Sequence, residues 1–326
     1  MIFILDILVL FLGLIFLWWA GERSVIYTQK LSKIYGLSTF FLGFVLLAIS
    51  TGIPELAVVI QSLWSGTPNL SLADIIGSNF LDVSVVLGLP TVIFSAIYID
   101  KSDYVKTIFM FGINIILMSF IFFSKSLTNF HGIFFILIYL ASCWYLWRTQ
   151  KKRGLISGAT EEIHEIISEK KNRKTKFNVF LNLFISLLMT LIASKICVIF
   201  AIKLVKASAL TFEIIGATII AIGTSLPEIT LNIAAIRRKD YSLAIGNSFG
   251  SVLEQGSLLI GLLALFSRSS INLSNIKYIA PFFYLAFIII GFGIIFRKKI
   301  NLLEGILLLL LTGVFFVYSY LSLLFV

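Results

Sequence analysis

The sequence GFVLLAISTGIPE at residues 43–55 returns as GATIIAIGTSLPE at residues 216–228. The two segments share Gly, Ala, Thr, Pro and Glu at matching positions, and each matching pair is 173 residues apart. The same offset, without a gap, pairs Gly77-Ser78 with Gly250-Ser251. Polar positions that match in register within an otherwise apolar chain indicate a duplicated structural unit.

The composition around these segments is typical of an integral membrane protein. Of the 326 residues, 59% are hydrophobic and 13% are charged, whereas a soluble domain is about a quarter charged. A helix needs about 20 apolar residues to cross a bilayer. We therefore predict an all-α membrane protein with ten transmembrane helices, at residues 2–20, 37–64, 70–98, 104–124, 130–148, 177–205, 210–236, 241–267, 278–296 and 302–325.

Gly, Pro and polar residues interrupt four of these runs, and we expect helices 2, 3, 7 and 8 to be discontinuous. The other six runs are more continuous. The net charge of +10 would suggest nucleic-acid binding in a soluble protein. Here the basic residues lie between apolar runs, so the positive-inside rule explains them and we expect membrane lipid, not nucleic acid, as the partner.

The distribution of charge predicts the orientation. Residues 148–176 hold nine Lys and Arg residues, so we place this connection in the cytoplasm. Alternation of the spans then puts 20 of the 26 Lys and Arg residues on the cytoplasmic side and 5 on the opposite side. This bias predicts a multi-pass protein of the cell membrane with both termini outside.

The number of spans in each half determines how the two halves are related. We expect a first five-helix repeat at residues 1–148, a cytoplasmic connecting loop at 149–176, and a second repeat at 177–326. An odd number of spans makes the second repeat enter the membrane from the opposite side. Inverted repeats of this kind are typical of secondary transporters, with the substrate site near mid-bilayer where the repeats meet.

Proline and glycine break the helices inside the repeated segment. Pro54 and Pro227 lack an N–H, so each removes one helical hydrogen bond, and Gly52 and Gly223 weaken the same turns. Backbone oxygens that lose their partners at membrane depth are tolerated only beside protein or a wet cavity. A dehydrated cation would satisfy them.

Glu55 and Glu228 immediately follow the two prolines, in the first turn of the continuing helix. The helix dipole there favours a carboxylate. Glutamates in the middle of a membrane span are costly and indicate a functional site, and no Lys or Arg in mid-span is available to pair with them. Hard cations such as Ca²⁺ and Na⁺ prefer oxygen ligands of this kind.

Two neighbouring spans add polar side chains at helical spacing. Ser78 and Asp82 are four residues apart and share a helix face, and Ser251 and Gln255 repeat that spacing. We therefore expect side chains from four discontinuous helices to converge on one cation site.

The two segments resemble the α-repeats of the sodium/calcium exchanger family, in the calcium/cation antiporter superfamily. The motifs are STGIPE at 50–55 with GSNFLD at 77–82, and GTSLPE at 223–228 with GNSFGS at 246–251. The family pattern is Gly-Thr-Ser-x-Pro-Glu followed by Gly-Asn-x-x-Gly-Ser-Asn. The resemblance implies exchange of several Na⁺ for one Ca²⁺ by alternating access, with the first and sixth helices sliding over the rest. We expect no bound cofactor.

The resemblance also implies a ligand set for the transported ions. Glu55 and Glu228 would be the central ligands, joined by hydroxyls and by backbone oxygens. The hydroxyls are those of Ser78, Ser225 and Ser251, and the backbone oxygens are those of Ala48, Thr51, Ala221 and Thr224.

Several positions depart from the family pattern. Gly52 stands where the motif has Ser, so one hydroxyl is missing. In prokaryotic members we expect Asn at the position of Asp82 and Asp at the position of Gln255, so the acid here has moved to the other repeat. Glu254 adjoins Gln255 but should point about 100° away around the helix, so we do not include it among the ligands.

Asp74 stands where the second repeat has Asn247. We expect it about one turn inside the outer end of the third span, in an external vestibule where it concentrates cations.

The alternative functions are coupling to H⁺ or K⁺ instead of Na⁺, a channel, and a membrane-bound enzyme. The H⁺-coupled branch of the superfamily carries a Gly-Asn-x-x-Glu-His signature, and neither His131 nor His164 lies near the repeats. No nucleophile with a base and no metal cluster suggests an enzyme. Inverted repeats with broken helices favour a transporter over a channel.

Overall fold

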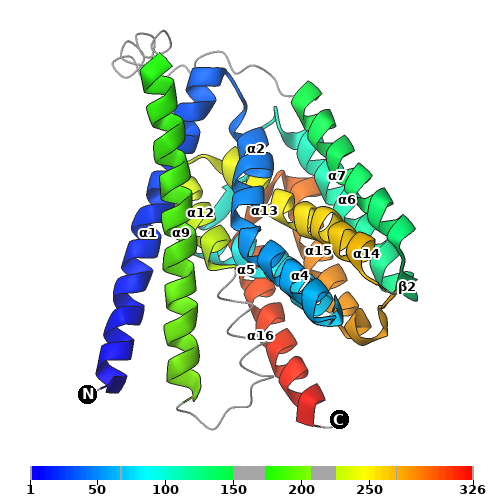
Figure 1. Ribbon diagram of the computed structural model, residues 1–326. Coiled ribbons are helices and arrows are strands. Elements are labelled where there is room, and N and C mark those ends of the chain that lie inside the picture. The colour runs from blue at the N-terminus through cyan, green and yellow to red at the C-terminus, as the bar shows by residue number, and fades with distance from the viewer. Residues whose placement is uncertain (1, 67, 150–172, 207–224, 269, 325–326) are drawn as a thin grey trace.

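The computed structural model describes residues 2–66, 68–149, 173–206, 225–268 and 270–324 (Figure 1). The described chain is helical apart from turns and four short strands, which confirms the all-α prediction. Six described helices are long and apolar enough to cross a membrane. A bent pair, Thr39–Thr51 and Ile53–Trp64, makes a seventh candidate.

In the first half of the chain the helices are α1 (Ile2–Tyr35), α2 (Thr39–Leu42), the π-helix η1 (Gly43–Leu47), α3 (Ala48–Thr51), α4 (Ile53–Ser65), α5 (Pro68–Phe94), α6 (Tyr104–Phe123) and α7 (Asn129–Thr149). In the second half they are α9 (Arg173–Lys206), α12 (Leu226–Arg237), α13 (Tyr241–Leu253), the π-helix η3 (Glu254–Leu259), α14 (Ile260–Phe266), the 3₁₀-helix η4 (Ser274–Ile279), α15 (Ala280–Phe292), the π-helix η5 (Gly293–Arg297) and α16 (Leu302–Leu324).

The longest helices, α1 and α9, have 34 residues each and lie side by side along one flank of the molecule (Figure 1). The sequence predicted that the first span ends at residue 20 and that the chain then forms a loop, and this prediction is wrong because α1 continues to Tyr35. Charged residues in this stretch do not end the helix, since Lys, Arg and Glu are good helix formers. The start of α1 and the end of α16 lie at the same end of the molecule (Figure 1).

The second span breaks where the sequence predicted. The segments Thr39–Thr51 and Ile53–Trp64 meet at an angle of 43°. Gly52 separates them, with backbone angles φ −75° and ψ 0°, and its N–H donates to the Ala48 carbonyl. Pro54 lies in the first turn of α4, where its missing N–H removes no helical hydrogen bond.

The third span is continuous, so the prediction that helix 3 is broken is wrong. α5 runs over 27 residues and contains Pro90. Pro90 cannot donate to the carbonyl four residues back, which belongs to Val86. Asn232 of α12 donates its Nδ2 to that carbonyl at 3.2 Å, and this tertiary contact replaces the lost hydrogen bond.

The eighth span is continuous too, which corrects the prediction for helix 8. Residues Tyr241–Phe266 form one apolar helix in which η3 is a π-helical segment. A π-helical turn holds an extra residue, so it rotates the side chains that follow relative to the preceding helix. The first half of the expected seventh span, residues 210–224, lies outside the described residues, and α12 is its second half.

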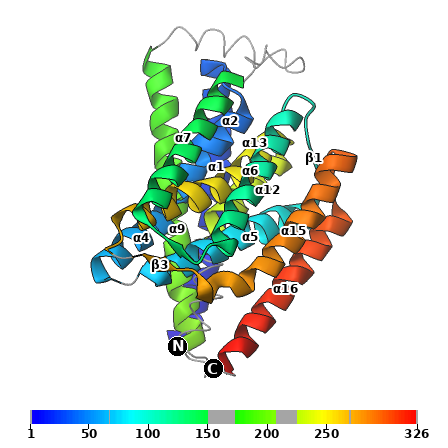
Figure 2. The ribbon, with the colours of Figure 1, turned by 90° about the vertical axis from the view of Figure 1, so that its right-hand side faces the viewer.

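The secondary structure repeats with the same offset of 173 residues as the motifs. α4 begins at Ile53 and α12 at Leu226, and α7 begins at Asn129 and α16 at Leu302. The strands β1 (Ala96–Tyr98), β2 (Ser126–Leu127), β3 (Ile271–Asn272) and β4 (Lys299–Asn301) form two antiparallel pairs, β1 with β4 and β2 with β3. The strands β1 and β3, one from each pair, lie at different levels of the molecule (Figure 2). Each pair joins the two halves of the chain.

Glycine allows α13 to pack directly against the backbone of the second span. A Cβ on Gly246 would clash with the Phe40 carbonyl, and one on Gly250 would lie 2.7 Å from the Phe44 Cα. These glycines belong to the GNSFGS motif. One reason for the motif is therefore close contact between helices, as in other membrane bundles.

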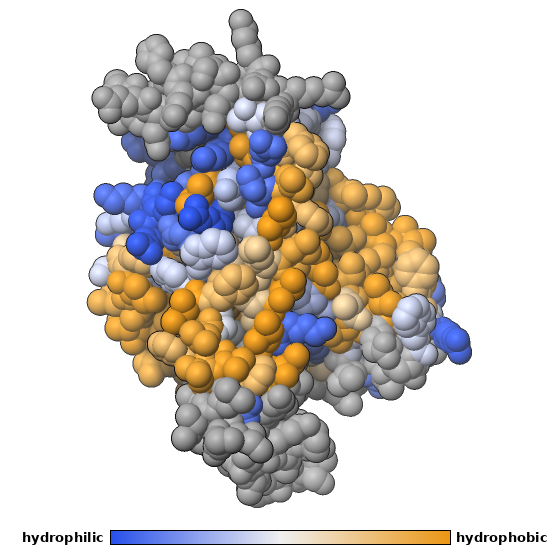
Figure 3. Space-filling model, turned by 60° about the vertical axis from the view of Figure 1, so that its left-hand side comes forward, coloured by the Kyte–Doolittle hydropathy of each residue, from blue (hydrophilic) through white to orange (hydrophobic). Residues whose placement is uncertain are grey.

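Large apolar side chains cover much of the outer surface (Figure 3). In this view apolar residues cover the middle, and hydrophilic residues gather toward the upper end. Trp64 and Phe123 are each 80% exposed. An apolar surface of this extent is expected of a protein surrounded by lipid.

Candidate cation site

The two halves of the chain present the same local geometry where a helix begins again. Gly52 precedes α4 with φ −75° and ψ 0°, and Ser225 precedes α12 with φ −83° and ψ 0°. Neither helix start has a capping side chain. Glu55 and Glu228 lie in the first turns of these two helices, as the sequence predicted.

The other predicted ligand side chains lie on two further helices and are also buried. Ser78 and Asp82 belong to α5, and Ser251 and Gln255 belong to the helix formed by α13 and η3. Gln255 Nε2 donates to Asp82 Oδ2 at 3.0 Å. These two residues are 173 positions apart, so equivalent positions of the two repeats meet face to face. This contact places Asp82 and Gln255 on either side of the boundary between the two halves.

The predicted ligands that the structure describes are all buried. The side chains of Glu55, Glu228, Asp82 and Ser78 are 0% exposed, and those of Thr51, Ser225, Ser251 and Gln255 are 1% exposed. Seven of these eight side chains have at least one buried oxygen without a hydrogen-bond partner, namely those of Glu55, Ser78, Asp82, Ser225, Glu228, Ser251 and Gln255. Buried polar atoms are normally paired, so a cluster of unpaired oxygens indicates a place for a ligand that accepts them.

The acids interact with one another rather than with cationic side chains. Glu228 lies within electrostatic range of Glu55, Asp82 and Glu254. In the described part of the chain, the Lys and Arg ion pairs lie elsewhere, between Lys106 and Asp103, between Arg237 or Arg238 and Glu22, and between Arg297 and Glu304. Buried carboxylates without cationic partners are strongly disfavoured unless an ion or a proton joins them.

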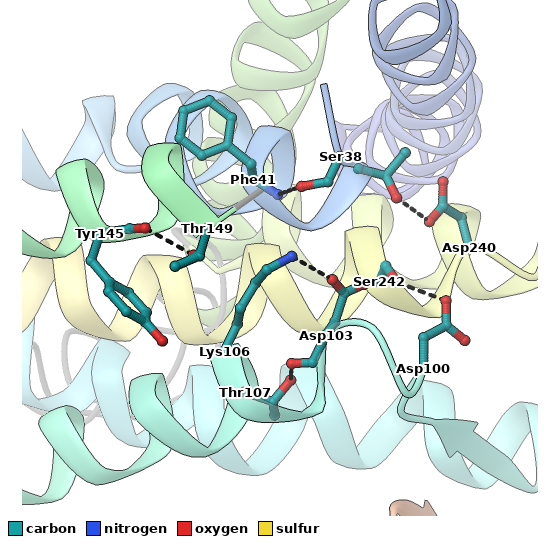
Figure 4. Close-up of polar contacts among 11 residues, drawn as sticks. Ser38, Phe41, Asp100, Asp103, Lys106, Thr107, Tyr145, Thr149, Asp240 and Ser242 are labelled. Carbon is teal, nitrogen blue, oxygen red and sulfur yellow. Dashed lines mark hydrogen bonds and ion pairs between the residues drawn. The ribbon is translucent and has the colours of Figure 1, made fainter. Parts of the chain in front are cut away.

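A second polar cluster shows how the same chain stabilises structural acids (Figure 4). Asp240 accepts hydrogen bonds from Thr39 Oγ1 at 2.8 Å, from Gln29 Nε2 at 3.0 Å and from the Leu243 N–H at 3.1 Å.

In the same cluster, Ser242 Oγ lies 2.6 Å from Asp103 Oδ2 and 3.0 Å from Asp100 Oδ2. Lys106 Nζ lies 2.8 Å from Asp103 Oδ1. Every carboxyl group here has a partner, in contrast with those of Glu55 and Glu228.

The donor set fits a hard cation. Among the described residues, no three carboxyl, imidazole or thiol groups come close enough to hold a metal ion by themselves. A cation would therefore take part of its shell from hydroxyl and amide oxygens. Thr51 lies beside the Glu228 carboxylate, and its hydroxyl donates to the carbonyls of Leu47 and Ala48, which leaves its own lone pairs free.

Two predicted features are less simple in the structure. The Ala48 carbonyl already accepts hydrogen bonds from the Gly52 N–H and from Thr51 Oγ1, so in this conformation it is not a free ligand. Asp74 lies in α5 and is half-buried, with one buried carboxylate oxygen unpaired, and its charge is within electrostatic range of Glu55. The predicted residues Ala221, Gly223 and Thr224 lie outside the described residues.

The sequence reasoning set aside Glu254, which the structure places in the same buried region. Its side chain is 3% exposed, and its carboxylate lies against Gly52. The estimate of about 100° between neighbouring residues assumed a regular helix, but the π-helix η3 begins at Glu254. The available signal was an acid in mid-span without a partner, the same signal that identified Glu55.

A family model described as sodium/calcium exchanger protein matches residues 5–148 and again residues 178–321. The chain belongs to the sodium/calcium exchanger family. It is therefore a membrane transporter of the cation antiporter type and not an enzyme.

Curated relatives and solved structures agree with this family. The chain is 24% identical to the sodium/calcium exchanger MaX1 of Methanosarcina acetivorans, over 96% of this chain and 97% of the relative. It is 28% identical to the membrane protein MJ0091 of Methanocaldococcus jannaschii, over 77% of this chain and 79% of the relative. Structures of the sodium-calcium exchanger NCX_Mj share the fold, with a TM-score of 0.79 at 23% identity over 98% of this chain and 99% of that one.

Proposed function

We propose that this exchanger moves Ca²⁺ against Na⁺ by alternating access, with Glu55 and Glu228 as the central ligands of both ions. The supporting observation is the pair of helix starts at Gly52 and Ser225, each followed by a buried, unpaired glutamate. Two carboxylates balance the charge of one Ca²⁺. The hydroxyls of Ser78, Ser225 and Ser251 add neutral oxygens, which a Ca²⁺ ion with about 6–8 ligands requires.

The proposal includes ten spans in two inverted five-helix repeats, at residues 1–148 and 177–326, joined by a cytoplasmic loop at 149–176. The repeated offset of the helices and the two strand pairs between the halves support this arrangement. The residues Ala48, Thr51, Ala221 and Thr224 would supply backbone oxygens in the conformations that bind ions. Both termini would lie outside the cell.

Alternating access requires part of the structure to move as a unit, and α1 with α9 is suited to this. The two helices pack along each other, and polar contacts hold α1 to the rest of the protein. Gln29 donates to Asp240 and accepts from Arg238 Nε at 3.3 Å, and Arg238 pairs with Glu22 at 3.0 Å. Partly exposed ion pairs of this kind contribute about 0–1 kcal/mol, so sliding would break them at small cost.

The flux of ⁴⁵Ca²⁺ into proteoliposomes tests the proposal. Gradients of Na⁺, K⁺ and H⁺ are imposed in turn, and we expect an outward Na⁺ gradient alone to drive uptake. Uptake driven only by an H⁺ gradient would contradict the choice of Na⁺. Uptake without any trans ion would contradict exchange itself.

Two substitutions test the ligand assignment. Glu55→Gln or Glu228→Gln should reduce Na⁺-driven uptake to the background of empty liposomes, because each removes a charged ligand without changing side-chain size. Glu304→Gln is the matched control, since Glu304 is also a buried glutamate in the first turn of a helix but is paired with Arg297 and the Asn301 N–H. Near-normal uptake by Glu55→Gln or Glu228→Gln, in protein that elutes as a single folded species, would contradict the assignment.

A further inference from the structure

Gly52 and Glu254 come from different halves of the chain and lie in direct contact. The Glu254 carboxylate lies where a side chain at position 52 would begin. A Cβ on Gly52 would lie 2.6 Å from Glu254 Oε2 and 3.0 Å from its Cδ. With a larger residue at position 52, the Glu254 carboxylate would have to shift from its present place at the break between α3 and α4. At the equivalent position of the other half, the residue is Ser225, and the counterpart of Glu254 is Leu81.

The Glu254 carboxylate has the features of a ligand rather than of a packing residue. Its side chain is 3% exposed, and Oε2 has no hydrogen-bond partner in the described structure. None of the ion pairs among the described residues includes it. A buried carboxylate in this state needs an ion or a proton, because desolvation of an isolated charge costs several kcal/mol or more.

The position of Glu254 connects it to the transport site. Its charge interacts with Glu228 and with Asp82, so the carboxylate belongs to the same buried acidic region. On another side, Tyr139 of α7 is 3% exposed and lies within electrostatic range of Glu254. Oxygen-bearing side chains of α5, α7 and α12 thus lie within electrostatic range of the Glu254 carboxylate.

We propose that Glu254, in the space left by Gly52, binds an additional monovalent cation during transport, with Na⁺ as the ion. The inference rests on the proposed Na⁺/Ca²⁺ exchange. The charge that Glu254 contributes gives the ion class: it adds one carboxylate to the set formed by Glu55, Glu228 and Asp82, and one monovalent cation balances one carboxylate. The pair Gly52 and Glu254 replaces the serine hydroxyl of the family motif with a charged ligand.

Direct ²²Na⁺ binding to the purified full-length protein tests this inference without requiring flux. The wild type should bind one more Na⁺ per chain than Glu254→Gln. Loss of a group that only orients a metal ligand weakens metal binding by about 10- to 100-fold. Loss of the charged ligand in Glu254→Gln should weaken Na⁺ binding at this position by at least as much. Glu304→Gln, the paired and buried control, should bind as many Na⁺ ions as the wild type.

In proteoliposomes, we measure for the same variants the Na⁺ gradient at which net Ca²⁺ flux against a fixed Ca²⁺ gradient is zero. This gradient reports the coupling ratio, and we expect Glu254→Gln to use one fewer Na⁺ per Ca²⁺. If Glu254→Gln does not fold, Gly52→Ser with Glu254→Ala restores the serine of the family motif, removes the carboxylate, and should show the same lower Na⁺ count. Gly52→Ser alone should weaken Na⁺ binding, because the new side chain displaces the carboxylate.

The outcomes separate this inference from the proposed function. If the wild type exchanges Ca²⁺ for Na⁺ and both Glu254 variants keep its Na⁺ count and coupling ratio, Glu254 is not a ligand and the inference fails alone. If the wild type shows no Na⁺-driven Ca²⁺ flux and binds no Na⁺, the proposed exchange fails as well.

Discussion

Because Asp82 and Gln255 are in contact, substitutions can move the negative charge from position 82 in one repeat to position 255 in the other. Gln255→Glu would leave two carboxylates where an amide now donates at 3.0 Å. With an effective dielectric constant of about 20, two charges at this separation repel by about 5 kcal/mol. The substitution also removes a hydrogen bond to a charged group, which contributes about 1.5–3 kcal/mol.

The double substitution Asp82→Asn with Gln255→Glu reverses the pair at constant side-chain length. The amide introduced at position 82 can then donate to the new carboxylate, so most of the lost stability should return. We expect the single variant Gln255→Glu to unfold at lower temperature than the double variant in Na⁺- and Ca²⁺-free detergent solution. The coupling free energy between the two positions should be several kcal/mol in a double-mutant cycle.

Flux measurements then show whether the reversed pair still serves transport. Asp82→Asn alone should still carry Ca²⁺, with a changed dependence on Na⁺, because the site has lost one charge. The shorter swap, Asp82→Asn with Gln255→Asp, gives the arrangement expected of prokaryotic relatives and should recover much of the activity. If Gln255→Glu is as stable as the double variant and Asp82→Asn leaves the Na⁺ dependence unchanged, the two side chains do not share a site.

Two further predictions concern the approach to the site and the packing around it. Asp74→Asn should raise the external KM for Ca²⁺ more at low than at high ionic strength, because a charge that only attracts cations is screened by salt; a salt-independent fall in maximal rate in flux assays would indicate coordination instead. Gly246→Ala should destabilise the protein by about 3 kcal/mol or more in thermal unfolding, because its new methyl group meets the Phe40 carbonyl. Gly112→Ala, where a Cβ has nothing within 4 Å, is the control and should be close to neutral.

The sequence predicted well those features that depend on local chemistry. The second span breaks at Gly52, and Pro54 lies in the first turn of the helix that follows, where a proline fits without loss of a helical hydrogen bond. The duplicated motif also predicted that Glu55 and Glu228 occupy equivalent positions. Burial of these acids followed from the long apolar runs on either side of them.

Features that depend on tertiary contacts were predicted less well. Gly, Pro and polar residues suggested a break in the third span, but at Pro90 the missing donor is supplied by Asn232, which lies 142 positions away in the sequence. Likewise, charges at residues 21–35 suggested a loop, whereas α1 is held there by partners on α9 and α12. Neither partner can be identified from the local pattern.

The departures from symmetry between the two repeats meet at one place. Asp82 and Gln255 are equivalent positions and bond to each other, so the amide of one repeat holds the acid of the other. Gly52 lacks the side chain that its counterpart Ser225 has, and Glu254 fills the vacated space. In both places a residue of one repeat contacts the residue of the other repeat that departs from the symmetric pattern. Because such contacts require the two halves to face each other, the substitutions that look irregular along the sequence are best understood as pairs across the boundary between the repeats.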